Sequence, residues 1–387
     1  MRPLCVAAAF AGFAGLAVSA PAVADVGVGG QVGAGAQGAS TYSSVELRLD
    51  VAWTHARLGI GVRGVWDDDE FRASDWSSAG RAVTIVRAFE ASGRVGETQL
   101  GVAAGALAPA RVGRIVDGYR VSLDDRWRTG VRAIARGGGD GGRGDELDAS
   151  LEIDDVLEPA LVGGGVRWQM AKPWGMHLAT AIDPGDERRG AASVGVVEVG
   201  AQRLFEGEGA RAELGGSVTA EIMIGAGALA YGSGEIEKWG VTWSARGDVR
   251  AGSGAGGSLF GPLYRIERVA HDGRMGIVDE AKMRGLGGVG AGIAIGARAE
   301  AGWLELEARE RPAIGPLFVV GAGAPMGARL QAAAWAAIAR DDAAGAGEVR
   351  VAWAKRLFSA LQAARIYRES DDAAVWTVTA WFGATTE

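Results

Sequence analysis

Charged side chains recur at every second position in several stretches of the sequence. Glu46, Arg48 and Asp50 alternate with apolar residues, and the same spacing returns in residues 246–250 and 305–309. Alternate residues of an extended chain point to the same side, so each stretch carries a row of acids and arginines on one face. Such rows attract and orient polar solutes when they face a water-filled space, and they disfavour apolar ones. The sequence therefore predicts passage or binding of polar solutes rather than covalent chemistry.

Residue types that serve catalysis and metal binding are scarce. The chain has no Asn, three His and one Cys (Cys5), so thiolate metal sites, disulfides and Cys nucleophiles are not expected in the mature protein. An embedded hydrolase is the enzyme alternative, with His177 as base and Ser193 on the next strand as its partner, but nothing in the sequence fixes the two together. The acidic residues 67–70 would suit Ca²⁺ or Mg²⁺, and we interpret them as a solvated loop. We predict no enzyme, no cofactor and no metal site.

Composition limits the partners. Sixty-four of 387 residues are Gly, 48% are hydrophobic, and 40 Lys and Arg accompany 47 Asp and Glu, which gives a net charge of −7. This hydrophobic content excludes a disordered chain. The acidic balance argues against nucleic acid as a partner, because phosphate neutralisation requires a clustered basic surface. No change of composition divides the chain, so we expect one large architecture.

The first 24 residues have the pattern of a cleaved export signal. Arg2 supplies the positive charge, residues 4–18 are apolar, and residues 22–24 (Ala-Val-Ala) fit a small-residue cleavage site. The apolar stretch is shorter than the ~20 residues that a membrane helix needs. We therefore expect residues 25–387 to form the mature protein as a single domain.

Beyond residue 24 the dominant sequence period is two. Apolar and polar residues alternate over residues 44–54, 57–66, 147–154, 211–224, 239–251 and 376–382. This alternation predicts an all-β fold whose strands have one apolar and one charged face. A tight turn at residues 55–56 would place Leu49 opposite Val62 and Arg48 opposite Arg63, with the apolar faces aligned.

The predicted strands suit a membrane better than water. They run to about ten residues, where soluble strands average about five or six, and Trp recurs near their ends, as a membrane interface requires. A soluble antiparallel sheet with one wet face is the alternative. The predicted interface aromatics are Trp53, Trp66, Trp168, Trp239, Trp303 and Trp376. The predicted pore-lining residues are Glu46, Arg48, Asp50, Arg57, Arg63, Asp148, Glu152, Arg211, Glu213, Arg246, Asp248, Arg250, Glu305, Glu307 and Arg309.

This pattern resembles that of Gram-negative outer-membrane β-barrels of porin size. The resemblance is one of architecture, covers residues 25–387, and implies a transmembrane antiparallel up-and-down β-barrel in the bacterial outer membrane. At roughly 20 to 23 residues per strand with its connection, the length predicts about 16 to 18 strands, an even number as in bacterial barrels. The resemblance also implies outer-membrane lipids, lipopolysaccharide and the barrel-assembly machinery as partners. The chain departs from the usual pattern after Phe382, which precedes the last five residues instead of ending the chain.

Residues 330–369 allow two interpretations. They are rich in helix formers, and Leu357, Leu361 and Ala364 have helical spacing, which would give a luminal or periplasmic helix. Residues 349–353 alternate, however, and the Ala-rich residues 330–338 also suit a lipid-facing strand. We prefer the strands.

A barrel of this size encloses more space than its own side chains fill. We therefore predict a water-filled pore for small hydrophilic solutes. Two alternatives remain. The barrel would be a conduit that exports a polysaccharide or another polymer, or a non-conducting scaffold of a cell-envelope complex with other envelope proteins as partners.

A closed barrel predicts a simple gel result. The purified protein, folded in detergent, should give a β-rich circular dichroism spectrum and should migrate faster on a denaturing gel before heating than after it. The reason is that a ring of strands satisfies all its backbone hydrogen bonds internally and resists the detergent until it melts. A helical spectrum would contradict the barrel.

Overall fold

The structure is a computed structural model. It describes residues 23–37, 40–67, 70–71, 85–105, 107, 110–119, 129–138, 146–156, 159–170, 173–185, 193–222, 225–253, 260, 287–312, 314–339, 343–354, 357–368 and 373–385. The expected export signal lies outside these residues except for positions 23 and 24, which begin the first strand. Cleavage after residue 24 stays a prediction. The described residues contain no helix that is long and apolar enough to cross a membrane.

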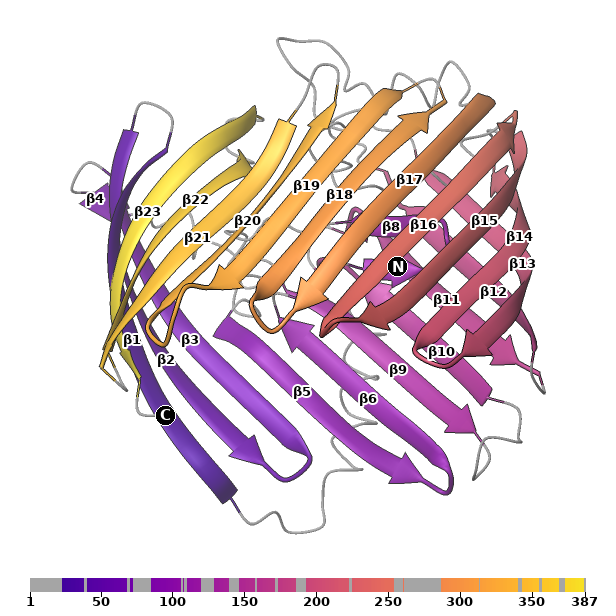
Figure 1. Cartoon of the computed structure of the whole chain (residues 1–387). Coiled ribbons are helices and arrows are strands. Elements are labelled where there is room, and N and C mark those ends of the chain that lie inside the picture. The colour runs from indigo at the N-terminus through magenta and orange to yellow at the C-terminus, as the bar shows by residue number, and fades with distance from the viewer. Residues whose placement is uncertain are drawn as a thin grey trace.

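Twenty antiparallel strands form a closed ring (Figure 1). In chain order they are β1 (Val23–Gln37), β2 (Ser40–Trp53), β3 (Ala56–Asp67), β5 (Val86–Val95), β6 (Thr98–Gly105), β9 (Gly130–Gly138), β10 (Glu146–Ile153), β11 (Val162–Gln169), β12 (Trp174–Asp183), β13 (Val194–Gly207), β14 (Ala210–Ile222), β15 (Gly225–Lys238), β16 (Val241–Gly252), β17 (Gly288–Ala299), β18 (Gly302–Arg311), β19 (Gly315–Pro325), β20 (Leu330–Ala339), β21 (Ala343–Ala354), β22 (Leu357–Arg368) and β23 (Ala373–Thr385). Each strand pairs with its neighbours in chain order, and β1 pairs with β23, which closes the ring.

The all-β barrel is confirmed, but the predicted count of 16 to 18 strands is wrong. Several connections are only two residues long, as at residues 208–209, 239–240 and 300–301. Each strand with its connection therefore uses fewer residues than assumed. The short β4 (Glu70–Phe71) extends β3, and β7 (Ala110–Val112) and β8 (Val116–Tyr119) form a separate hairpin.

The strands have an apolar outer face and a mostly polar inner face. On β2, Leu47 points outward and is 65% exposed, whereas Ser44 and Glu46 point inward and are 1% and 6% exposed. Outward side chains on other strands are likewise more than half exposed; they include Val62, Leu214, Val218, Ile293 and Phe318. A continuous apolar surface of this extent is unfavourable in water. The wall is built for contact with lipid.

The register between β2 and β3 differs from the predicted one by two residues. Val62 lies opposite Leu47 rather than Leu49, and Arg63 lies opposite Glu46 rather than Arg48. The turn is centred on Thr54 and His55 rather than on His55 and Ala56, because the last residues paired are Ala52 and Arg57. A His-Ala pair does not readily take the positive φ angles that a two-residue hairpin turn requires. A shift of two residues leaves every side chain on its predicted face.

The two ends of the barrel have different connections. We call one the turn end, defined by the short connections at residues 54–55, 96–97, 208–209, 239–240 and 300–301, and the other the loop end, defined by the connections 68–85, 106–129 and 253–287. β1 begins and β23 ends at the turn end. Short connections at the turn end therefore alternate along the chain with longer ones at the loop end.

Residues 330–339, 343–354 and 357–368 are strands, so the helical alternative is wrong. The reason lies in the inner face of β19 and β20, where Leu317, Val319 and Ala337 form a small apolar cluster. With apolar side chains on both faces, β20 lacks the alternation that marks a strand. Pairing with both neighbours then outweighs helix propensity.

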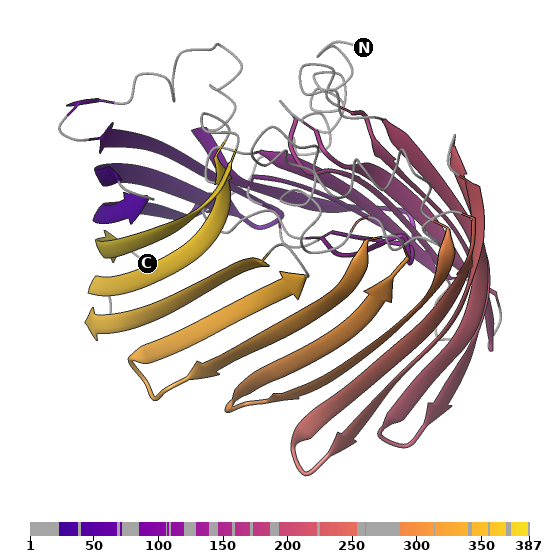
Figure 2. The ribbon, with the colours of Figure 1, turned by 90° about the horizontal axis from the view of Figure 1, so that it is seen from above.

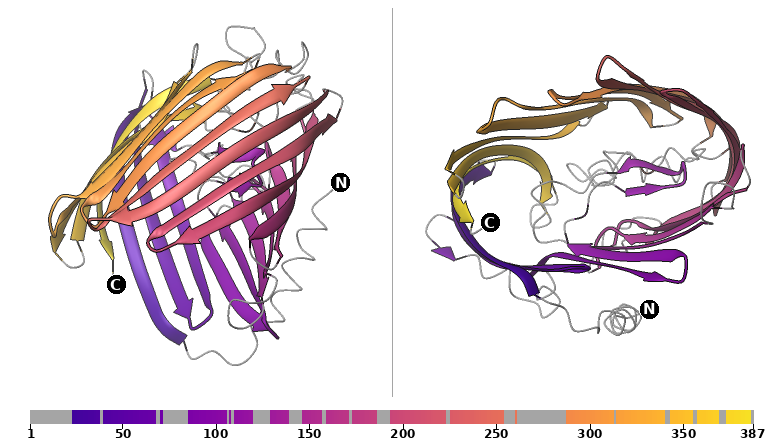
Figure 3. Two further views of the ribbon diagram at one scale, coloured as in Figure 1. Left: turned by 45° about the vertical axis from the view of Figure 1, so that its right-hand side comes forward. Right: turned by 60° about the horizontal axis from the view of Figure 1, so that its bottom comes forward.

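The hairpin β7–β8 lies inside the ring (Figure 2), as the view from below also shows (Figure 3). Its apolar residues Ile115 and Val116 are 1% and 0% exposed, and Val116 forms a bridge with Phe260 from the β16–β17 connection. Leu161, from the β10–β11 connection, is also fully buried. Segments from the loop end thus build a small apolar core within the barrel.

If the apolar outer face contacts lipid, a charged substitution on it should lower the free energy of unfolding, and most of all near the middle of the membrane. Leu47→Arg, near the middle of β2, should lower the free energy of unfolding from lipid vesicles by about 2–4 kcal/mol, because the charge meets hydrocarbon. Leu47→Ala, which removes the same side chain without adding charge, should cost clearly less. Equal losses in urea titrations would mean that Leu47 does not face lipid.

Candidate functional site

All fifteen side chains that the sequence assigns to the pore lining lie on the inner faces of their strands. On β2 and β3, Asp50 accepts a hydrogen bond from Arg48 at 2.8 Å and lies 3.5 Å from Arg57. Glu46 accepts a hydrogen bond from Gln31 at 3.0 Å and lies 3.6 Å from Arg87. The predicted charges therefore meet as ion pairs, and Arg87 and Gln31 complete a group that the sequence analysis did not identify.

A second group spans β16 to β18. Arg246 donates to Glu307 at 2.6 Å and lies 3.9 Å from Glu305. Glu307 also lies 2.9 Å from Arg309, and Arg250 pairs with Asp248 at 2.6 Å along its own strand. On β10, Asp148 lies 3.7 Å from Arg136, and Glu152 pairs with Arg132. The pairs on β9 and β10 join neighbouring strands, Arg246 reaches across β17 to β18, and the remaining pairs lie along one strand. This mixed charge lets each of these carboxylates keep a cation close.

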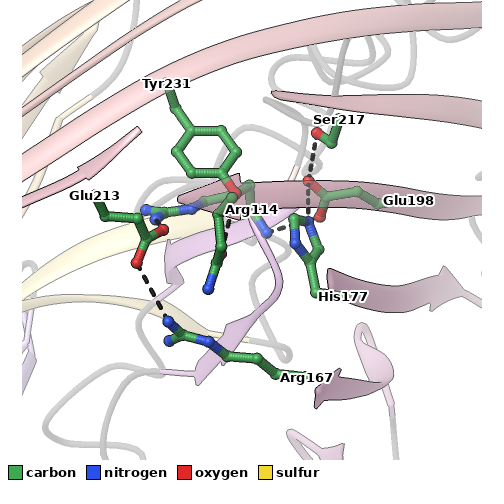
Figure 4. A network of polar contacts seen from close by, with 8 residues as sticks. Arg114, Arg167, His177, Glu198, Glu213, Ser217 and Tyr231 are labelled. Carbon is green, nitrogen blue, oxygen red and sulfur yellow. Dashed lines mark hydrogen bonds and ion pairs between the residues drawn. The ribbon is translucent and has the colours of Figure 1, made fainter. Parts of the chain in front are cut away.

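The internal hairpin is fastened to the wall through Glu198, a fully buried residue of β13 (Figure 4). Its carboxylate accepts from the backbone N–H of Arg114 at 2.8 Å and from the Ser217 hydroxyl at 2.7 Å. His177 Nε2 lies 3.2 Å away, on β12. A buried carboxylate is stable only when its oxygens are satisfied, so these three partners explain how β13 tolerates it.

Gly113 makes this approach feasible. It has φ +55°, a conformation that glycine adopts without strain. A Cβ at this position would lie 2.5 Å from the Cβ of Ala179 and 2.5 Å from Glu198 Oε2. The hairpin turn therefore reaches the wall only because no side chain is present at residue 113.

The Arg114 side chain makes a second attachment. Its guanidinium lies 4.2 Å from the centre of the Tyr231 ring and donates to Glu213 at 2.5 Å (Figure 4). Glu213 also lies 3.3 Å from Arg167, and Gln202 lies 3.1 Å from the Tyr231 hydroxyl. Planar cations stack on aromatic faces and pair with carboxylates at once. Backbone and side chain of Arg114 thus hold the hairpin against β12 to β15.

A cavity of 560 Å³ opens beside this attachment, on the inner side of β14 to β18. Its charged lining residues are Arg114, Arg167, Arg211, Arg246, Arg298, Glu213, Glu235 and Glu305. Within the described part of the chain, no carboxylate lies within ion-pair distance of Arg211 or Arg298. The cavity therefore carries positive charge that its own acids do not balance.

Five of the six predicted interface aromatics lie on the outer face or in a turn. Trp53 and Trp168 point outward at the turn end, Trp66 and Trp376 point outward near the loop end, and Trp239 is 81% exposed in the turn at residues 239–240. Whether they lie at a membrane surface stays a prediction.

Trp303 was assigned to the wrong face. It shares the inner face of β18 with Glu305 and lines the luminal cavity. Its ring lies over Gly321 and Gly323 of β19, where added Cβ atoms would meet it at 2.8 and 2.4 Å. These two glycines provide the space that lets a large ring turn inward.

The two residues of the hydrolase alternative lie too far apart to act together. Ser193 precedes Val194, which pairs with Asp183, whereas His177 pairs with Gly200. At ~3.3 Å per residue this separates Ser193 from His177 by about 20 Å. The hydroxyl near His177 is that of Ser217, which donates to Glu198 instead. Among the described residues, no group of three His, Cys, Asp or Glu could hold a metal ion, and the acidic run at residues 67–70 lies partly outside them.

Glu213 is among the predicted pore-lining residues, but the sequence pattern reveals neither the hairpin nor Arg114 and Glu198, which attach it. Residues 110–119 lie in a long connection without clear periodicity. Glu198 stands in a valine-rich stretch, and a lone carboxylate in such a stretch was the signal that could have identified it.

Comparison of the sequence with models of known protein families gives no match, and comparison with curated proteins gives none either. Comparison of the fold with solved structures does give matches. The chain is similar in architecture to porins. Pseudomonas aeruginosa OccK5 (OpdH) matches at 9% identity over 95% of this chain and 99% of that one, with a TM-score of 0.39. A BenF-like porin from Pseudomonas fluorescens Pf-5 matches at 9% identity over 93% and 97%, with a TM-score of 0.38. A mutant of Rh. blastica porin matches at 10% identity over 93% and 99%, with a TM-score of 0.32.

Loss of the Glu198 carboxylate should free the hairpin. In protein folded from residues 25–387, which contain no Cys, Val112→Cys is buried at 1% exposure and should react slowly with a maleimide. Adding Glu198→Ala should speed that reaction at least several-fold, because the Arg114 N–H loses its acceptor. Asp50→Asn, which removes an inner-face carboxylate from β2, is the control and should leave the rate unchanged. An unchanged rate with Glu198→Ala would mean that other contacts hold the hairpin.

Proposed function

We propose that this protein is a pore of the bacterial outer membrane that lets small hydrophilic solutes diffuse across. The observation that carries the proposal is the combination of a closed twenty-strand barrel, an apolar outer wall and a charged inner wall with a cavity of 560 Å³. Barrels with about 16 to 18 strands already leave an aqueous channel, and those with about 22 hold a plug. A ring of twenty has room both for the internal hairpin and for water.

The charge distribution supports selectivity for polar solutes. Most inner-face charges are paired, so they present dipoles rather than a strong net field. Arg211 and Arg298 differ, since no described carboxylate pairs with them. A solute entering the cavity would exchange part of its water shell for these fixed groups, which favours hydrophilic and anionic solutes over apolar ones.

The hairpin would narrow the passage. Glu198 and Glu213 hold Arg114 against the inner wall, so the hairpin stays inside the barrel and occupies part of the cross-section of the pore. We infer that it sets the largest solute that passes. No specific feature supports the polymer conduit. The hairpin also suits a non-conducting scaffold, so a measurement of conductance distinguishes the pore from the scaffold.

Planar-bilayer recording tests the pore and its selectivity together. The folded protein should give ohmic steps of current. Arg211→Gln with Arg298→Gln should raise the preference for cations over anions, because two unbalanced positive charges are removed from the cavity. The change should be larger at ~0.1 M than at ~1 M salt, since the Debye length falls from about 10 Å to about 3 Å.

A charge-neutral double variant is the control. Arg250→Gln with Asp248→Asn removes one charge of each sign and should leave the selectivity nearly unchanged. Barrels that are fully folded by the gel test and carry no current at any voltage would refute the pore and leave the scaffold.

A further inference from the structure

An apolar groove of 710 Å³ lies on the outer wall near the turn end, across β13 to β18. Small residues form its floor: Ala212, Gly234 and Ala245 lie side by side on β14, β15 and β16. A Cβ at Gly234 would meet nothing closer than 3.6 Å, so the space above it is open. Larger outward side chains form the rims; they are Phe205, Ile236, Trp243, Ile295, Leu304 and Leu306. The size falls within the range of ligand pockets, about 300–1,000 Å³.

One end of the groove carries a cation. Arg203 points outward two residues before Phe205 on β13. Its guanidinium lies 5.1 Å from the centre of the Phe205 ring and 5.5 Å from that of Trp174 on β12. No carboxylate within the described residues lies at ion-pair distance from it. A guanidinium between two rings is fixed in place but keeps its hydrogen-bond donors free.

An unpaired arginine on a lipid-facing wall requires an anion or water. Charged groups there extend toward the membrane surface, where phosphates are found. Trp168 and Trp174, both outward and at the turn end, are the residue type that concentrates at headgroup depth. Arg203 therefore lies where a phosphate can reach it, beside a groove that is suited only to hydrocarbon.

We propose that this groove binds one phospholipid, with an acyl chain in the groove and the anionic phosphate on Arg203. The lining is almost wholly apolar, which suits a hydrocarbon chain and not a polar solute. The unpaired guanidinium at its end suits the phosphodiester that every phospholipid carries. A protein partner would have to place a carboxylate at the lipid-facing wall to supply that anion, which is costly there, whereas a phospholipid carries its own phosphate. The proposal is independent of whether the barrel conducts.

The test measures lipid retained by the detergent-folded protein in native mass spectrometry, with phosphatidylglycerol and phosphatidylethanolamine as probes. One phosphatidylglycerol should survive delipidation. Ala245→Phe, which fills the groove, should reduce retention of both lipids. Arg203→Gln should weaken phosphatidylglycerol binding about five-fold, the effect of ~1 kcal/mol for one cation near a membrane surface.

Two variants control for general effects of bulk and charge. Ala334→Phe adds the same ring to the outer face of β20, outside the groove. Arg350→Gln removes a second guanidinium stacked on a ring, that of Phe358 at 4.0 Å, and lies on β21, outside the groove. Both should retain lipid as the parent does.

Retention that neither Ala245→Phe nor Arg203→Gln changes would overturn the proposal. So would loss of oligomers in Ala245→Phe with unchanged lipid, which would make the groove an interface between copies of the chain. If Ala245→Phe fails to fold in the gel test, Ala297→Leu on β17 fills the same groove and gives the same reading.

Discussion

The pairing of β1 with β23 is the constraint on which the rest of the barrel depends. Without it, a twenty-strand sheet would expose two rows of backbone N–H and C=O groups to lipid, which offers no hydrogen-bond partner. The sequence meets this demand with glycine in β1. A Cβ at Gly33 would lie 2.6 Å from the Trp381 ring, and one at Gly35 would lie 2.1 Å from the Val378 carbonyl oxygen. The ring can therefore close because β1 has no side chain at the two positions where β23 packs against it.

Once the ring is closed, its interior must accommodate charge at low cost. Several inner-face acids, such as Asp50, Glu152 and Asp248, have an arginine on the same or the next strand as a counter-ion. Glu198 differs from these acids, because it is fully buried, accepts hydrogen bonds from a backbone N–H and a hydroxyl, and has the His177 imidazole 3.2 Å away. That backbone N–H belongs to the hairpin. The stability of a wall residue and the position of an internal segment are thus one interaction.

The sequence predicts the faces of the strands far better than their number or register. Period two placed Glu46, Arg211 and Arg246 on the inner face because alternation is a local property that each strand expresses alone. The strand count depends on connection lengths, and the β2–β3 register depends on turn geometry, neither of which the hydrophobic pattern contains. Trp303 went to the wrong face because its inward position depends on two glycines of the next strand. The hairpin was invisible for the same reason, since its position depends on distant partners.

Strand β13 shows how two faces fix one structure. Its even-numbered residues Glu198 and Gln202 serve the hairpin attachment, and its odd-numbered residues Arg203 and Phe205 form one end of the outer groove. A slip of one residue in the register would move a buried carboxylate into lipid and an aromatic ring into the charged lumen. Both errors carry a large free-energy cost, and they cannot be relieved separately because the side chains share one backbone. The polar network inside and the apolar groove outside therefore stabilise the same register. A change that shifts the register of β13 would disrupt both surfaces.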